Sequence, residues 1–203
     1  MSLKLAVIYY SSTGTVDAMA RRAAAIGEKT GAKVRLRQVP ELAPDNAIDS
    51  VEEWREHVDA TASEPTATAD DIVWADAVLL GSPTRFGNVA SQLKNYLDSL
   101  GPQWGQGQLA DKVYAGFTSS QTDHGGQEST LLALYNTIHH FGGIIVAPGY
   151  TDPLKFADGN PYGVGHVTGP DNAEPVGDVA EAALDHMVER VLDVARKLTT
   201  TTN

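Results

Sequence analysis

Hydrophobic positions along the chain follow two periods, one typical of buried strands and the other of helices. Residues 3–10 form an apolar run rich in β-branched and aromatic side chains, which predicts a buried parallel strand. Val16, Met19 and Ala23 then recur at helical spacing, so we expect a helix to begin near Thr15. The chain therefore opens with a strand, a short polar loop and a helix.

The same alternation of strand and helix continues to the end of the chain. Further strands are predicted at 32–39, 77–81, 112–118 and 143–148, and helices at 51–58, 70–75, 89–100, 128–140 and 178–198. Five strands joined by helical crossovers predict one α/β domain spanning residues 1–203, with a doubly wound parallel sheet and helices on both faces.

Two long stretches interrupt this pattern. Residues 40–68 contain three prolines, and residues 150–177 are rich in Gly, Pro, Asp and Asn. Apart from the short helix at 51–58, neither shows a clear period. Excursions this long within a compact domain are usually functional or disordered.

Polar loops follow the first, third and fourth strands, at 11–16, 82–88 and 119–126. In a doubly wound sheet these loops open on the same edge, at the carboxyl ends of the strands, where ligands bind. The first loop holds three hydroxyl side chains and Gly14 before a helix, an arrangement that suits a phosphate monoester. It matches neither the dinucleotide nor the triphosphate glycine motif. The alternative is a hydroxyl-rich turn with a helix cap and no ligand.

Composition narrows the function further. The chain has 203 residues, 42% of them hydrophobic and 20% charged, as in an ordinary globular domain. A net charge of −11 argues against binding to nucleic acid. The chain has no cysteine, which excludes disulfides, thiolate catalysis and iron–sulfur ligation. We find no signal peptide and no run of membrane-spanning length, so we expect a cytoplasmic protein without membrane insertion. No metal site is predicted.

Four motifs together resemble one family. They are Ser-Ser-Thr-Gly-Thr-Val at 11–16, Gly-Ser-Pro-Thr-Arg-Phe-Gly-Asn at 81–88, Gly-Gln-Glu at 126–128 and His-His at 139–140. This combination resembles the WrbA family of flavodoxin-like, FMN-dependent NAD(P)H:quinone oxidoreductases. The resemblance covers nearly the whole chain and implies a five-stranded sheet of order 2-1-3-4-5, bound FMN and a homo-oligomer, specifically a tetramer. It also implies that NAD(P)H and a quinone react in ping-pong order.

The resemblance implies a set of cofactor-binding residues. Residues 11–16 would hold the FMN phosphate, residues 83–87 would lie beside the isoalloxazine ring, and residues 119–125 would surround its pyrimidine edge and ribityl chain. The implied residues are Ser11, Ser12, Thr13, Gly14, Thr15, Val16, Pro83, Thr84, Arg85, Phe86, Gly87, Ser119, Ser120, Gln121, Thr122, Gly125 and His140. Gln121, Asp123 and His124 depart from the family pattern of threonine and glycines.

The resemblance also implies a catalytic residue and a substrate site. His140 would stabilise negative charge on the reduced ring as a hydrogen-bond donor, although it could instead cap the end of a helix. Phe86, Trp104 and Tyr150 would form an aromatic box for a planar substrate, partly across subunits. The alternative function is a flavodoxin-type electron carrier that docks on redox partners, which the acidic charge would also suit.

Overall fold

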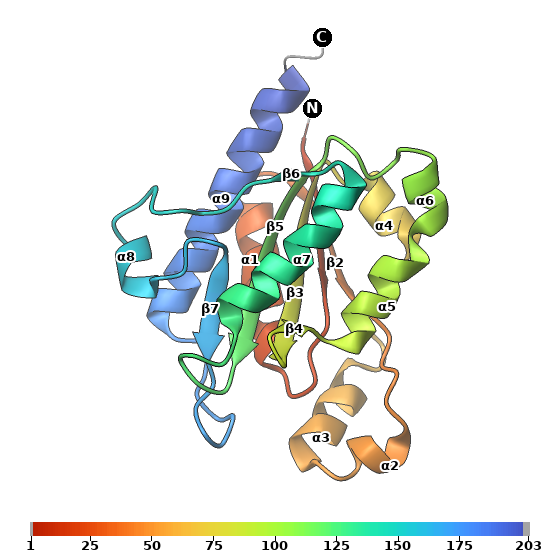
Figure 1. Ribbon diagram of the computed structural model, residues 1–203, viewed down its shortest axis with the longest axis vertical. Coiled ribbons are helices and arrows are strands. Elements are labelled where there is room, and N and C mark those ends of the chain that lie inside the picture. Colours follow the sequence, from red (N-terminus) through yellow and green to blue (C-terminus); the bar gives the residue numbers. More distant parts are fainter. Residues whose placement is uncertain (1, 201–203) are drawn as a thin grey trace.

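The protein is built on a sheet whose main strands are ordered β2-β1-β3-β5-β6, with helices on both faces (Figure 1). The computed structural model describes residues 2–200. This order confirms the predicted arrangement 2-1-3-4-5, with β5 as the fourth strand and β6 as the fifth. The strands are β1 (Lys4–Tyr9), β2 (Lys33–Gln38), β3 (Ala77–Arg85), β4 (Asn88–Val89), β5 (Val113–Ser120), β6 (Ile144–Ile145) and β7 (Val164–Val167).

Helices cover both faces of the sheet, as expected for right-handed crossovers. α1 (Thr15–Lys29) and α9 (Asp178–Thr200) pack on one face, and α4 (Ala69–Trp74), α5 (Ser91–Ser99) and α7 (Gln127–Phe141) pack on the other. The remaining helices are α2 (Asp45–Ile48), α3 (Glu52–Thr61), α6 (Gly101–Gly105) and α8 (Lys155–Asp158). No helix among residues 2–200 is long and apolar enough to cross a bilayer.

The alternation of side chains along β1 builds both cores at once. Leu5 and Val7 point into the cluster formed with α1 and α9, whereas Ala6 and Ile8 point into the cluster formed with α5 and α7. All four are fully buried. A central strand covered on both faces can be apolar throughout, which is why this run was readable from sequence.

Strand β3 extends four residues further than the predicted strand at 77–81. Residues 82–85 were expected to lie in a loop, but Ser82 and Pro83 continue the ladder opposite Thr118 and Ser119 of β5. β3 then turns back into β4 as an antiparallel hairpin. Proline has a low strand propensity, so the sequence did not predict this extension. It forms because β5 provides a pairing partner.

The fifth strand position is divided between two segments. The predicted strand at 143–148 is reduced to β6, which pairs only with Val113 and Tyr114. β7 pairs with the other half of β5, from Phe117 to Ser120. β7 and α8 both lie within 150–177, where the sequence showed no period. That excursion therefore supplies part of the sheet.

A buried ion pair organises this excursion. Lys155 is fully buried, and its Nζ contacts the carboxylate of Asp158 and donates to the carbonyl oxygen of Gly163 at 3.0 Å. Burial raises the pKa of Asp158, although the neighbouring lysine opposes that shift. The pair fixes the turn between α8 and β7, which positions the strand that follows.

Candidate functional site

The loop between β1 and α1 is shaped to receive an anion. Gly14, at the N-cap of α1, has φ of 98°, a conformation in which glycine is unstrained. Its N–H donates to Ser11 Oγ at 3.1 Å, which closes the loop. The N–H groups in the first turn of α1 have no acceptor within the helix and carry the positive end of its dipole. The loop therefore presents amide and hydroxyl donors together.

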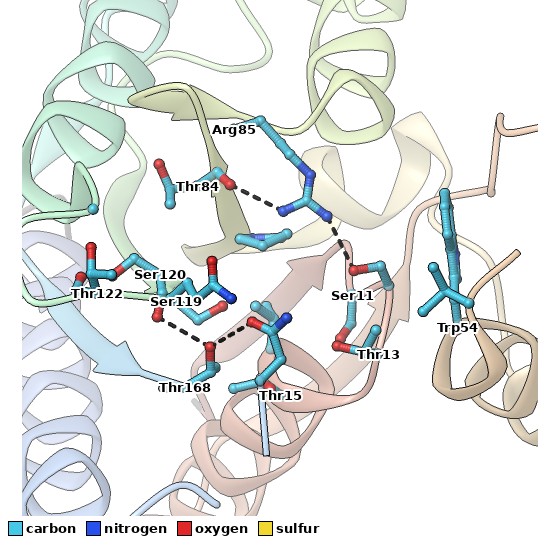
Figure 2. Close-up of a pocket in the computed structure, with 17 residues that line it drawn as sticks. Ser11, Thr13, Thr15, Trp54, Thr84, Arg85, Ser119, Ser120, Thr122 and Thr168 are labelled. Atoms are coloured by element: carbon cyan, nitrogen blue, oxygen red, sulfur yellow. Dashed lines mark hydrogen bonds between the residues drawn. The ribbon is translucent and has the colours of Figure 1, made fainter. Parts of the chain in front are cut away.

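Arg85 connects the β3–β4 hairpin to this first loop. Its guanidinium donates to the carbonyl oxygen of Thr84 at 3.0 Å and to Ser12 Oγ at 3.1 Å (Figure 2). The next two residues form the tip of the hairpin, where Phe86 has φ of 53° and Gly87 has φ of 76°. A left-handed phenylalanine is rare, and its side chain is fully exposed.

The third loop follows β5 and is held by β7. Ser120 Oγ donates to the carbonyl oxygen of Thr122 at 2.8 Å, and the Gly125 N–H donates to the same oxygen at 2.9 Å. The Thr168 N–H donates to the Ser120 carbonyl at 2.8 Å, and Thr168 Oγ1 donates to Asn172 Oδ1 at 2.9 Å. The excursion thus contributes a wall to the site (Figure 2).

These loops surround a cavity of about 550 Å³ at the carboxyl ends of the central strands. This volume lies within the usual range for small-molecule sites. Among the described residues that line it, none is acidic and Arg85 carries the one charge. In a chain with a net charge of −11, an acid-free cavity lined by hydroxyls and one arginine favours an anionic ligand.

The residues present fit a flavin mononucleotide. Its single phosphate matches the amide and hydroxyl donors of the first loop, which has neither a lysine nor a magnesium-binding carboxylate. Its planar ring and ribityl hydroxyls match the uncharged walls formed by Pro83, Thr84 and Ser119. The fold and the site together define a flavodoxin-like protein with a mononucleotide cavity at the edge of its sheet.

Comparison with known proteins gives the family. A model described as NADPH-dependent FMN reductase matches residues 3–151. The chain is 44% identical over 197 residues to a Deinococcus radiodurans protein named "NAD(P)H dehydrogenase (quinone)", covering 97% of each chain. It is 35% identical over 200 residues to a protein of the same name from Rhodopseudomonas palustris, covering 96% of this chain and 98% of that one.

A solved structure supports the fold. A WrbA-like flavodoxin from Agrobacterium tumefaciens superposes with a TM-score of 0.67 and 23% identity, covering 97% of this chain and 99% of that one. The chain belongs to the NADPH-dependent FMN reductase family and to the family of the NAD(P)H dehydrogenases (quinone) that are 35% to 44% identical to it.

The cavity brings together most of the residues implied as cofactor ligands. Gly14 shapes the first loop through its backbone, and Phe86 and Gly87 lie beyond the cavity wall at the hairpin tip. Their roles at a cofactor stay predictions. The implied residues that line the cavity are Ser11, Ser12, Thr13, Thr15, Val16, Pro83, Thr84, Arg85, Ser119, Ser120, Gln121, Thr122 and Gly125.

The expected catalytic residue, His140, and two of the expected aromatic residues, Trp104 and Tyr150, do not line the cavity. His140 is exposed in the last turn of α7 (Figure 1), whereas the cavity residue Gly125 lies just before the first turn of that helix. Trp104 of α6 lies beside it and donates from Nε1 to the His140 carbonyl oxygen at 2.7 Å. Tyr150 stacks on Phe156 in the excursion, with ring centroids 4.8 Å apart. Within one chain, the structure therefore pairs His140 with Trp104 and separates both from the cavity.

Four cavity residues were missed from the sequence. Val51 and Trp54 come from the α2–α3 segment, and Thr168 and Asn172 come from the loop that follows β7. A tryptophan in a short helix next to the phosphate loop was a usable signal for the first pair. Nothing local marked the second pair, because pairing of β7 with β5 alone brings them to the site.

Glu41 holds Trp54 at the cavity wall. Its Oε2 accepts from Trp54 Nε1 at 2.9 Å and from the Tyr10 hydroxyl at 2.7 Å. Its Oε1 accepts from Gln92 Nε2 and from the backbone N–H groups of the next two residues, at 2.6 to 2.9 Å. Burial alone would raise the pKa of Glu41, but these hydrogen bonds outweigh it and lower the pKa. The carboxylate therefore stays charged and joins α3 to the end of β1.

His57 lies beside the first loop but does not line the cavity. A side chain placed at Gly14 would meet its Nδ1 at 3.7 Å, and its buried Nε2 has no hydrogen-bond partner among the described residues. Burial lowers the pKa of His57. The neutral imidazole is therefore the form that the folded protein favours at this position.

Proposed function

We propose that the protein is an FMN-dependent NAD(P)H:quinone oxidoreductase. The observation that carries this proposal is the acid-free cavity, whose hydroxyl and amide donors suit one phosphate and whose remaining walls suit a flat ring. Relatives at 35% to 44% identity over nearly the full chain bear the name NAD(P)H dehydrogenase (quinone). An electron-carrying flavodoxin is the less favoured function.

Bound FMN would supply the redox chemistry, accepting two electrons from reduced nicotinamide and delivering them to a quinone. The protein contributes position and electrostatics. The amides and hydroxyls of the first loop would anchor the phosphate, and Arg85 would place a positive charge where negative charge accumulates on reduction. Since one cavity serves both substrates, donor and acceptor would occupy it in turn, which gives ping-pong kinetics.

The separation of His140 from the cavity supports a homo-oligomer, and the resemblance of the sequence motifs to the WrbA family implies a tetramer. His140, Trp104 and Tyr150 are all exposed, and each could complete the cavity of a neighbouring subunit. In that arrangement His140 would donate a hydrogen bond to the reduced ring of the neighbour. We also place the protein in the cytoplasm, where its reduced nicotinamide donor is available.

One anaerobic titration tests the activity. The purified protein, loaded with FMN, should lose its flavin absorbance when NADH or NADPH is added and should recover it when benzoquinone follows. Flavin that stays oxidised under excess NADH and NADPH would overturn the proposal and would favour the electron carrier.

Subunit complementation tests the role of His140. Gly14→Asp should abolish FMN binding, and His140→Ala should retain the cofactor but lose most activity. If His140 acts across subunits, unfolding and refolding the two variants together should restore activity through mixed oligomers. Continued inactivity of a mixture shown to contain mixed oligomers would contradict this arrangement.

A further inference from the structure

A second cavity of about 580 Å³ adjoins the first. Trp54 and Arg85 line both cavities, so these two side chains form the partition between them. The second cavity lies between the α2–α3 segment, the β3–β4 hairpin and the start of α5. Besides Trp54 and Arg85, its lining includes Tyr10, Gln92 and Lys94.

The wall of this cavity is held in place. The indole of Trp54 is fixed through Nε1 to Glu41, which also accepts from Tyr10 and Gln92 in the same wall. Gln92 Nε2 further donates to the Tyr10 hydroxyl at 3.1 Å. Each oxygen of Glu41 already accepts at least two hydrogen bonds, so the carboxylate is committed to its donors. An aromatic ring fixed in this way offers a surface on which a planar group can stack.

The second cavity has basic residues in its lining, although the chain as a whole has a net charge of −11. Among the described residues lining it, Arg85 and Lys94 are basic and none is acidic. Lys94 is exposed and pairs with Asp98, one turn further along α5. Exposed pairs of this kind are weak, so Lys94 can turn toward an anion in the cavity at little cost. Two cations beside a fixed indole favour a ligand that is both aromatic and anionic.

We propose that this second cavity binds the adenosine diphosphate half of the reduced nicotinamide dinucleotide. The adenine would stack against Trp54, and the diphosphate would lie beside Arg85 and Lys94. Because the two cavities lie side by side, with Trp54 and Arg85 at the border between them, one molecule would pass over this border and place its nicotinamide in the flavin cavity. This inference rests on the proposed function and names the part of the chain that would recognise its donor.

Two electron donors distinguish this site from the flavin site. NADPH and NADH carry the adenosine diphosphate, whereas 1-benzyl-1,4-dihydronicotinamide carries only the reacting ring. Lys94 lines the second cavity alone. In the FMN-loaded enzyme, Lys94→Met should raise the KM for NADPH and NADH about tenfold with kcat unchanged, while the kinetics with the benzyl donor stay as in wild type.

Two matched variants sharpen the test. Lys29→Met removes an exposed lysine at the far end of α1 and should change neither donor's kinetics. Asp98→Asn releases Lys94 from its ion pair and should lower the KM for NADPH and NADH. An unchanged KM in Lys94→Met, or equal losses with the benzyl donor, would overturn the inference.

A binding measurement separates this inference from the proposed function. Calorimetric titration of FMN-loaded protein with 5′-ADP needs no turnover and should show binding that weakens about tenfold in Lys94→Met. No binding of 5′-ADP to the wild type would overturn the second site, even if NADPH reduces the flavin. Binding of 5′-ADP without reduction by any donor would instead overturn the oxidoreductase and leave a nucleotide site.

Discussion

Replacing Glu41 by glutamine is expected to loosen the α2–α3 segment from the sheet. Five donors converge on the carboxylate, three on Oε1 and two on Oε2. A glutamine can keep its oxygen on the side with three donors, which places its NH₂ against Trp54 and Tyr10. The Tyr10 hydroxyl can rotate to accept from that NH₂, but the Trp54 indole can only donate. One N–H group therefore loses its partner.

The expected cost follows from that count. A buried donor left without a partner costs about 1–3 kcal/mol. Trp54 is only half-buried, so water can partly replace the lost acceptor. Loss of the charge-assisted hydrogen bonds adds to the cost, and we expect Glu41→Gln to lower the free energy of unfolding by about 2 kcal/mol. Since Trp54 lines the flavin cavity, the Kd for FMN should rise as well.

Urea unfolding of the FMN-free protein, followed by far-UV circular dichroism, measures the first effect, and quenching of flavin fluorescence measures the second. Glu56→Gln, an exposed site on the same segment, is the control and should stay within about 0.5 kcal/mol of wild type. A free energy for Glu41→Gln equal to that of the control would refute the reasoning.

The same substitution carries a pH signature. The pKa of Glu41 is lowered in the folded protein, so its ionisation stabilises the fold above the pKa of the unfolded chain. This contribution disappears as the pH falls through the lowered, folded-state pKa. The stability difference between wild type and Glu41→Gln should therefore be largest near neutral pH and shrink in acid.

Three further outcomes are expected. Gly14→Ala has room for its methyl group but must adopt a positive φ, so it should cost about 1–2 kcal/mol in urea unfolding and weaken FMN binding in a fluorescence titration; wild-type values for both would contradict the loop geometry. His57 has a pKa lowered by burial, so the unfolded chain takes up a proton that the folded chain resists, and stability should fall as the pH drops below about 6.5. His57→Gln should flatten this part of the profile, unlike His124→Gln at an exposed position. Lys155→Met leaves Asp158 buried without its cation and should lower the free energy of unfolding by about 3–5 kcal/mol. Asp158→Asn added to the same chain should recover a large part of this stability, which unfolding midpoints measure.

Features set by local pattern were predictable from the sequence. The strand before Ser11 and the helix after Gly14 follow from the hydrophobic period, and the short polar loop between them follows from its glycine and hydroxyl content. Convergence of the three loops at one edge followed from topology alone, and the cavity is lined by residues from all three.

Features set by tertiary context were not predictable. Pro83 extends a strand because β5 provides its partner, and β7 is a strand only because half of β5 is left unpaired by β6. Trp54 reaches the cavity through its hydrogen bond to Glu41, which is thirteen positions earlier in the chain. Family resemblance pointed to His140, but the sequence could not say that α7 places it far from the cavity of its own chain.

The division of the fifth strand position has a consequence for how this chain meets other chains. Long, flat strands at a sheet edge invite pairing with another molecule and hence aggregation. One edge here consists of β6, with two residues, and β7, with four, offset along β5. The opposite edge, β2, carries Arg35 and Arg37, both paired with Asp71. Both edges are therefore poor templates for another strand, and we expect copies of this chain to associate through helices and loops and leave the sheet closed to further growth.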